Sequence, residues 1–329
     1  MVEQQERLWE YDAVEPGQEG PHTVVTLTPE NIATYARVAQ NPDQRYQKEG
    51  ASQEFGGTLV PMPTMALTYA PLLRGEIAEK NGFLALEQSQ TARRQTPFAK
   101  CEARWFRPVQ AGDTITGMGR VLEKYERRGS KFVTFRIEAT NQHGQPTGQY
   151  DYTCIFKYAQ GQRGVPPDRG TAQPEVPDAT ARSASQLLAF DAISVGDQLA
   201  TLAVTESQEI IDRKDNFRLA GKRSDSNIHT DEEFARQNIF GGTVNSGPAT
   251  MSYVDQMLEL SFPLSAFYHG GSLLMRAITP FRSGDTVTFQ GEITDKRQEG
   301  EQKVVECRVK GINQRGDLVC LADATLVMP

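Results

Sequence analysis

The sequence predicts an α+β protein of two related halves, each with an apolar helix wrapped by a curved antiparallel sheet. The first observation is an internal repeat: Gly-Asp-Thr at 112–114 returns at 284–286, and Asn-Gln-x-Gly at 141–144 returns at 313–316, both 172 residues later. The second is an alternation of apolar and polar residues before each Asn-Gln-x-Gly element, which is typical of half-buried antiparallel strands. Shared order and shared turn residues indicate an internal duplication.

Two matches further upstream extend the repeat. Tyr-Asp-Ala-Val at 11–14 matches Phe-Asp-Ala-Ile at 190–193, and Phe-Gly-Gly-Thr at 55–58 recurs at 240–243. Four matches in the same order therefore span most of the chain.

The length of 329 residues exceeds the usual size of a single core. We expect one domain at 1–158 and a second at 186–329. Residues 159–185 contain four prolines and little to bury, as expected of an exposed linker.

Composition excludes several classes of protein. A net charge of -7 argues against nucleic-acid binding. The four cysteines are widely separated and lack CxxC spacing, so we expect no metal site, no redox motif and no cofactor, and free thiols in a reducing compartment. The N-terminus lacks an apolar signal, and no run approaches the roughly 20 apolar residues that span a bilayer. A soluble, cytoplasmic protein without membrane association is expected.

Each half first contains a polar helix and then an apolar one. The first polar helix is predicted to start at the N-cap Thr28, followed by Pro29, and its counterpart starts at Thr205. The apolar segments 63–80 and 247–260 follow the glycine-rich turns and are predicted as helices.

Strands are predicted at 131–139 and 303–309, where apolar and polar residues alternate. The Asn-Gln-x-Gly element after each is a tight-turn signal in which glycine supplies positive φ. Residues 127–131 are predicted to form a hairpin turn.

The sharpest difference between the halves precedes the second Phe-Gly-Gly-Thr turn. Asp225, Asn227, His229 and Asp231 lie within seven residues there, and the matching part of the first half contains no histidine. A histidine beside an aspartate can hold and polarise one water near neutral pH. The alternative is a surface loop with turn hydrogen bonds, followed by a helix with Thr230 as N-cap.

Asp-Ser-Asn-Ile-His-x-Asp ahead of Gly247 resembles the motif of the MaoC-like hydratases and dehydratases, which include the (R)-specific enoyl-CoA hydratases. The Gly-Asp-Thr strand entry and the Asn-Gln-x-Gly turn resemble that family too. The resemblance implies a double hot-dog fold, in which one chain forms a pseudo-dimer of two sheets, each around a central helix. It also implies a catalytic C-terminal half and an N-terminal half that supports the acyl pocket.

By this resemblance, Asp225 and His229 hold the attacking water and Asn227 fixes the loop. The backbone N–H of Gly247 would stabilise the thioester enolate oxygen at a helix N-terminus. Glycine there allows close approach, whereas the first half has Met62 between two prolines and is expected to be inactive.

The sequence departs from the family motif at one point. The family places Asp five residues before His and a proline after Asn, but here Asp225 lies four residues before His229 and no proline is present. Either Asp225 still serves after loss of one residue, or Ser224 occupies the acid position.

The expected substrate contacts are Asn227, Ser246, Lys222 and Arg223. The two cations lie beside the site loop, where they would meet a phosphate of coenzyme A or remain solvated. His269 would either border the pocket or be structural.

The predicted function is reversible hydration of an α,β-unsaturated acyl thioester carried by coenzyme A or acyl carrier protein. Both protons would move on one face of the substrate. The alternatives are a thioesterase or isomerase on the same scaffold, and a non-catalytic acyl-thioester-binding protein. A monomer or a homodimer of double hot dogs is expected.

Overall fold

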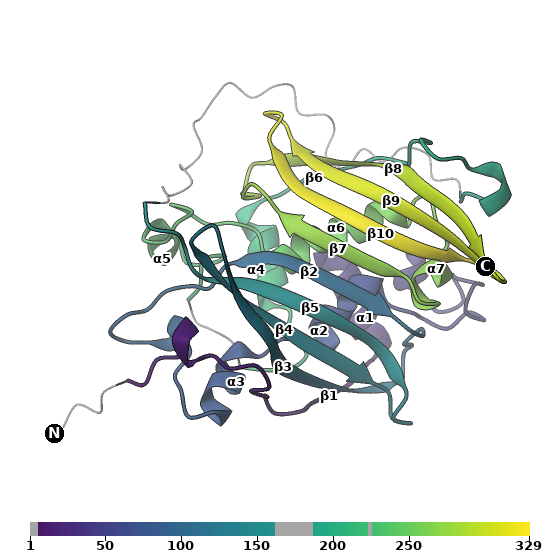
Figure 1. The fold of residues 1–329 in the computed structure, drawn as a ribbon. Coiled ribbons are helices and arrows are strands. Elements are labelled where there is room, and N and C mark those ends of the chain that lie inside the picture. Colours follow the sequence, from purple (N-terminus) through teal and green to yellow (C-terminus); the bar gives the residue numbers. More distant parts are fainter. Residues whose placement is uncertain (1–5, 162–186, 223–225) are drawn as a thin grey trace.

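The computed structural model describes residues 6–161, 187–222 and 226–329. Ten strands form one antiparallel sheet in the order β1-β3-β4-β5-β2-β7-β10-β9-β8-β6 (Figure 1). The strands are β1 (Thr23–Thr26), β2 (Phe98–Trp105), β3 (Thr114–Arg127), β4 (Ser130–Thr140), β5 (Pro146–Lys157), β6 (Leu202–Thr205), β7 (Ser272–Ala277), β8 (Thr286–Glu299), β9 (Gln302–Asn313) and β10 (Leu318–Met328).

The strand order confirms the duplication. Each half contributes five strands in equivalent positions, and the halves join where β2 pairs with β7, with Cys101 opposite Met275. This arrangement is the predicted double hot dog. Most of the expected linker, 162–186, lies outside the described residues, and the domain boundaries stay a prediction.

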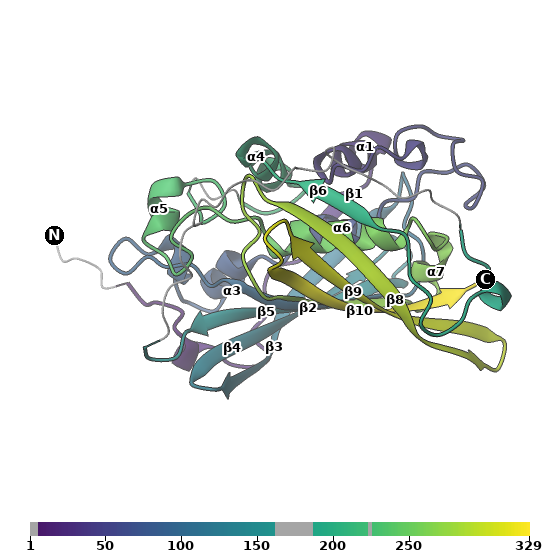
Figure 2. The same ribbon diagram turned by 90° about the horizontal axis from the view of Figure 1, so that it is seen from above.

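The helices gather on one side of the sheet, and α6 lies along it (Figure 2). They are α1 (Pro29–Val38), α2 (Ala66–Tyr69), α3 (Arg74–Lys80), α4 (Gln208–Asn216), α5 (Glu232–Arg236), α6 (Gly247–Leu258) and α7 (Ser265–Tyr268). Five 3-10 turns accompany them: η1 (Tyr11–Ala13), η2 (Gln44–Tyr46), η3 (Pro63–Met65), η4 (Leu86–Gln88) and η5 (Phe190–Ala192). Every α6 residue from 249 to 258 is buried, so α6 forms the centre of the core.

The prediction of one apolar helix over 63–80 was wrong. That segment is divided into η3, α2 and α3. Pro71 lies in the break, and it has no N–H to donate and a ring that clashes with the preceding turn. Only the second half has a long central helix.

Helix starts were predicted with mixed success. Thr28 is the N-cap of α1 and accepts a hydrogen bond from the Asn31 N–H, as expected. In the second half Thr205 ends β6 instead, and Ser207 is the N-cap of α4. Asp231, not Thr230, is the N-cap of α5. In both cases a residue one or two positions along the chain offers its side-chain oxygen to the helix N–H groups.

The predicted strands and turns are confirmed. The expected strands at 131–139 and 303–309 lie within β4 and β9. Gly144 and Gly316 have φ values of 70° and 84°, the left-handed conformation that the turns require. All four cysteines are buried and free.

Two further features concern sites and membranes. Within the described ranges, no group of three or more His, Cys, Asp or Glu side chains is placed to hold a metal ion. In the same part of the chain, no helix is long and apolar enough to cross a membrane.

Candidate active site

His229 lies in the loop between α4 and α5, and one of its ring nitrogens is fixed. Its Nδ1 is 2.8 Å from the carbonyl oxygen of Val244. Because a carbonyl only accepts, Nδ1 carries the proton and Nε2 keeps a lone pair. Burial lowers the pKa of His229, opposed by the Val244 carbonyl and by the charge of Asp215. The imidazole is therefore neutral at pH 7 and can accept a proton at Nε2.

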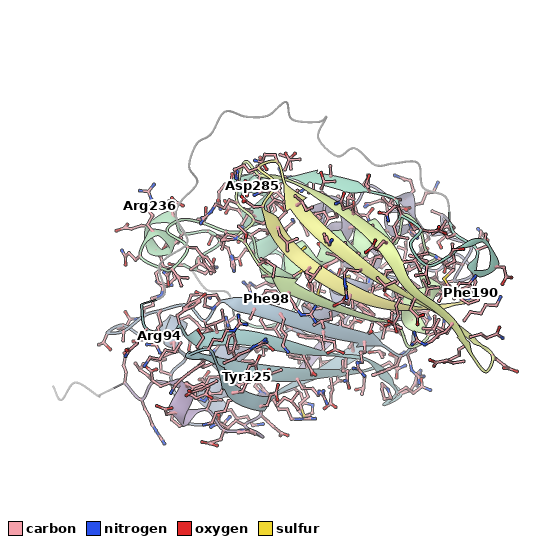
Figure 3. The ribbon with its side chains drawn as sticks, turned by 45° about the horizontal axis from the view of Figure 1, so that its top comes forward. Arg94, Phe98, Tyr125, Phe190, Arg236 and Asp285 are labelled. Carbon is pink, nitrogen blue, oxygen red and sulfur yellow. The ribbon has the colours of Figure 1, made fainter. Side chains whose placement is uncertain are left out.

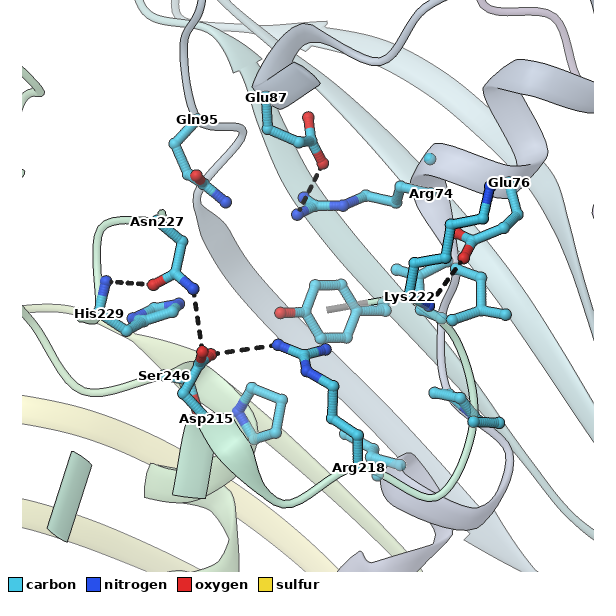
Figure 4. Close-up of a pocket in the computed structure, with 18 of the residues that line it drawn as sticks. Arg74, Glu76, Glu87, Gln95, Asp215, Arg218, Lys222, Asn227, His229 and Ser246 are labelled. Carbon is cyan, nitrogen blue, oxygen red and sulfur yellow. Dashed lines mark hydrogen bonds and ion pairs between the residues drawn. The ribbon is translucent and has the colours of Figure 1, made fainter. Parts of the chain in front are cut away.

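Asn227 links His229 to Asp215 of α4. Its Oδ1 accepts from the backbone N–H of His229 at 2.7 Å, and its Nδ2 donates to Asp215 Oδ2 at 3.0 Å (Figure 4). The Asp215 side chain is only 9 % exposed, and its Oδ1 is 3.3 Å from a guanidinium nitrogen of Arg218. One amide side chain thus holds a carboxylate and a neutral histidine in the same region.

The sequence reasoning missed Asp215, although a signal was present. Asp215 is the penultimate residue of α4. An acidic residue in the last turn of a helix opposes the helix dipole, so a carboxylate there invites a specific explanation.

The N-terminus of α6 presents a free donor beside this loop. Ser246 is the N-cap, and its Oγ accepts from the Ala249 N–H at 3.3 Å. Pro248 has no N–H. Among the described residues, the Gly247 N–H has no hydrogen-bond acceptor. The first turn of α6 therefore offers the Gly247 N–H to a ligand. In the first half, the buried side chain of Met62 occupies the matching place.

A polar cavity of about 710 Å³ lies beside the histidine loop and the start of α6. His229, Asn227 and Asp215 of the second half line it together with Arg74 and Gln95 of the first half (Figure 4). Gln95 Oε1 is buried without a partner among the described residues. Both halves therefore line this cavity, although the sequence did not single out Arg74 or Gln95.

A second cavity of about 330 Å³ adjoins the first at His229. Its lining is mainly aromatic and aliphatic and includes Gly247. The reactive groups thus lie where a polar cavity and an apolar cavity meet.

Two family models match the chain. Residues 196–314 match the model described as a MaoC-like domain. Residues 196–314 therefore form a MaoC-like domain. Residues 16–148 match the model described as a FAS1-like dehydratase domain region. No curated protein matches the sequence at a significant level.

Solved structures share the fold. A putative MaoC domain protein dehydratase from Chloroflexus aurantiacus superposes with a TM-score of 0.67 at 15% identity, covering 97% of each chain. A conserved hypothetical protein from Mycobacterium tuberculosis, described as having a double hotdog fold, gives a TM-score of 0.60 at 13% identity, covering 97% of this chain and 98% of that one. Peroxisomal multifunctional enzyme type 2 from Drosophila melanogaster gives a TM-score of 0.57 at 15% identity, and the match covers 94% of this chain and 48% of that one.

The MaoC-like domain holds its site with a buried ion pair. Lys214 Nζ, next to Asp215 on α4, is 2.6 Å from Glu206 Oε1, and the two side chains are 8 % and 0 % exposed. The same Glu206 oxygen accepts from Asn245 Nδ2 at 3.0 Å and from the hydroxyl of Tyr253. Asn245 Oδ1 in turn accepts from the Ser246 N–H at 2.9 Å. This network ties α4 to the start of α6.

The predicted site residues fall into three groups. Asn227, His229 and Ser246 line the polar cavity between the halves, and Gly247 lines the apolar one with His229. Lys222 lies at the rim, 74 % exposed, with its Nζ 3.4 Å from a Glu79 oxygen. Asp225 and Arg223 lie outside the described residues, and their roles stay predictions, as does that of Ser224.

His269 is absent from both cavity linings and its Nδ1 is 2.8 Å from the Ser265 carbonyl oxygen, which favours the structural alternative.

Proposed function

We propose that this protein reversibly adds water across an α,β-unsaturated acyl thioester carried by coenzyme A or acyl carrier protein. One observation carries the proposal: a neutral histidine with an available Nε2 lines the polar cavity together with the largely buried carboxylate of Asp215. The same histidine lines the apolar cavity together with Gly247, whose N–H has no acceptor among the described residues. The match of the second half to the MaoC-like domain supports the same reaction class.

His229 is the base in this mechanism. Its Nε2 removes one proton from the water, and the resulting hydroxyl group bonds to the β-carbon. The double-bond electrons move toward the thioester carbonyl, and the enolate oxygen accepts a hydrogen bond from Gly247 N–H. The imidazolium of His229 then returns the proton to the α-carbon. The product gains one hydrogen and one hydroxyl group on the same face.

Asp215 positions the water and balances the positive charge that forms on His229. Its carboxylate accepts the second hydrogen of the water, and its negative charge stabilises the imidazolium that forms on His229. The hydrogen bonds through Asn227 support this role because they fix both groups relative to one another. Asp225, the carboxylate that the sequence motif suggests, is the alternative that mutagenesis must separate.

The decisive experiment follows hydration and hydrolysis together. Crotonyl-CoA is incubated with the protein, and loss of the conjugated-thioester absorbance is recorded beside release of free thiol. We expect hydration without thiol release, and its loss in His229→Ala but not in His269→Ala. Thiol release that depends on His229 would replace the proposal with a thioesterase. Turnover unaffected by His229→Ala would reject this active site.

A further inference from the structure

An aromatic pair separates the two cavities that meet at His229. Tyr152 of β5 lines the polar cavity, and Phe98 at the start of β2 lines the apolar one. Their ring centroids are 5.0 Å apart in an edge-to-face arrangement. Both come from the first half, whereas the candidate reactive groups come from the second. Figure 3 labels Phe98, which begins the strand that joins the two halves.

Phe98 lies directly on the start of α6. A Cβ built on Gly247 would be 2.3 Å from Phe98 Cγ and 2.4 Å from its Cδ1. Ser246 and Pro248, on either side of Gly247, line the polar cavity, whereas Gly247 lines the apolar one. The Phe98 ring therefore lies beside a route that leads over Gly247 from one cavity into the other.

A thioester has the shape to occupy both cavities. The carbonyl carbon carries two arms, the acyl chain and the thiol of the carrier, which point in different directions. With the carbonyl oxygen at Gly247, one arm extends into each cavity. The carrier arm, rich in amides and phosphates, suits the polar cavity, where Arg74 and Arg218 contribute to the lining.

The apolar cavity suits only an uncharged acyl arm. Among its described lining residues, none carries an Asp, Glu, Lys or Arg side chain. Burying a charge there without a partner would be strongly unfavourable. Ile278 lines this cavity and is 54 % exposed, so the cavity lies close to the protein surface at that point.

We propose that Phe98 determines acyl specificity by closing the passage over Gly247 between the polar and the apolar cavity. The acyl arm enters the apolar cavity when the Phe98 ring swings off Gly247, and the preferred substrates are apolar acyl thioesters. This inference rests on the proposed function where kcat/KM is measured. The affinity for saturated thioesters can be measured without turnover.

The test compares wild type with Phe98→Leu and Phe98→Ala. The matched control is Phe106→Leu, a phenylalanine just beyond the other end of β2 that is 42 % exposed and outside both cavity linings. The probes are 2-enoyl-CoA thioesters of increasing chain length, with a β-branched member, assayed for kcat/KM. Thermal unfolding of each variant reports whether it is folded.

We expect Phe98→Leu to raise kcat/KM for the longest and the branched substrates about tenfold relative to crotonyl-CoA, and Phe106→Leu to leave the ratio unchanged. Retention of the wild-type ratio in both Phe98 variants, or an equal change for every acyl group, would overturn the proposal.

Affinities of saturated acyl thioesters, measured by calorimetry, distinguish failure of the Phe98 proposal from failure of the proposed function. Each CH₂ that enters the apolar cavity should tighten binding about fourfold. Succinyl-CoA should bind about tenfold or more weakly than butyryl-CoA. A chain-length dependence of affinity that changes in Phe98→Leu, without any hydration, would retain the inference and remove the hydratase. Hydration by the wild type, with a chain-length dependence of affinity that Phe98→Leu leaves unchanged, would retain the hydratase and remove the role of Phe98.

Discussion

Asn227 donates a 3.0 Å hydrogen bond from its side-chain amide to Asp215 Oδ2, across twelve residues of sequence. The bond connects the end of α4 to the loop that carries His229. Asp215, which lines the same cavity as His229, is therefore held at a fixed position relative to the histidine loop. The motif at 225–231 would direct mutagenesis to Asp225 instead.

Asp215→Asn should therefore lower kcat for hydration about 100-fold, because the water loses its charged acceptor and the imidazolium its counter-charge. Asp225→Asn should have a much smaller effect. Steady-state kinetics on both variants, with far-UV circular dichroism as a folding control, makes the comparison. The reverse order of effects would assign the acid to Asp225.

The rate should depend on the protonation of His229. Since burial lowers its pKa from 6.5, the base is neutral above that pH and becomes inactive as the pH falls through the lowered value. A profile of kcat/KM against pH should show an acidic limb with a midpoint below 6.5. A midpoint above 6.5 would contradict a buried, neutral base.

Glu206 should matter for stability more than its distance from the cavity suggests. Glu206→Gln leaves Lys214 buried with no negative partner, and we expect a loss of about 3 kcal/mol in the free energy of unfolding. Lys214 would respond partly by losing its proton, since burial already lowers its pKa to about 8. Urea unfolding of Glu206→Gln, of a single substitution of Lys214 and of the double variant measures the coupling between the two residues. Additive effects would show that the pair is not coupled.

Asp255 should make the protein less stable at high pH. Asp255 on α6 and Glu259, the C-cap of that helix, are both buried, and burial together with their mutual repulsion raises the pKa of Asp255 well above its usual value. Because its pKa is higher in the folded state, the protonated form stabilises the protein at low pH. That stability is lost as the pH rises from the unfolded-state pKa through the folded one.

Chemical denaturation of wild type and Asp255→Asn across pH 4 to 9 tests this sign. In the wild type, the Thr64 N–H donates to Asp255 Oδ2 over 2.9 Å. The side-chain oxygen of asparagine can accept the same hydrogen bond. The variant should show a flatter dependence of unfolding free energy on pH. An equal slope in both proteins would show that Asp255 does not titrate over that range.

Gly247→Ala should lower both stability and activity, because the site has no room for a methyl group. The added methyl group would overlap the Phe98 ring, so we expect a loss of about 1–3 kcal/mol in unfolding free energy and a large loss of activity. Combining it with Phe98→Ala should restore most of the stability. A double variant no more stable than Gly247→Ala would show that the strain arises elsewhere.

Local sequence determined much of the scaffold. The alternating residues of β4 and β9, the glycines at 144 and 316, and the Thr28 cap form contacts with neighbours along the chain or within one hairpin. The comparison of the halves also singled out His229 and Gly247, because a duplicated chain shows where one copy differs. In the 63–80 segment, the apolar pattern predicts one helix, but Pro71 divides it.

Only the tertiary structure brought Asp215, Phe98 and the Glu206–Lys214 pair to the site. Phe98 is nearly 150 residues from Gly247 along the chain, and its place follows from the pairing of β2 with β7. No local propensity encodes such a contact, because its energy arises from packing between elements that fold from distant parts of the sequence. The sequence itself therefore determined the duplicated scaffold and one histidine, whereas packing decided which groups surround that histidine.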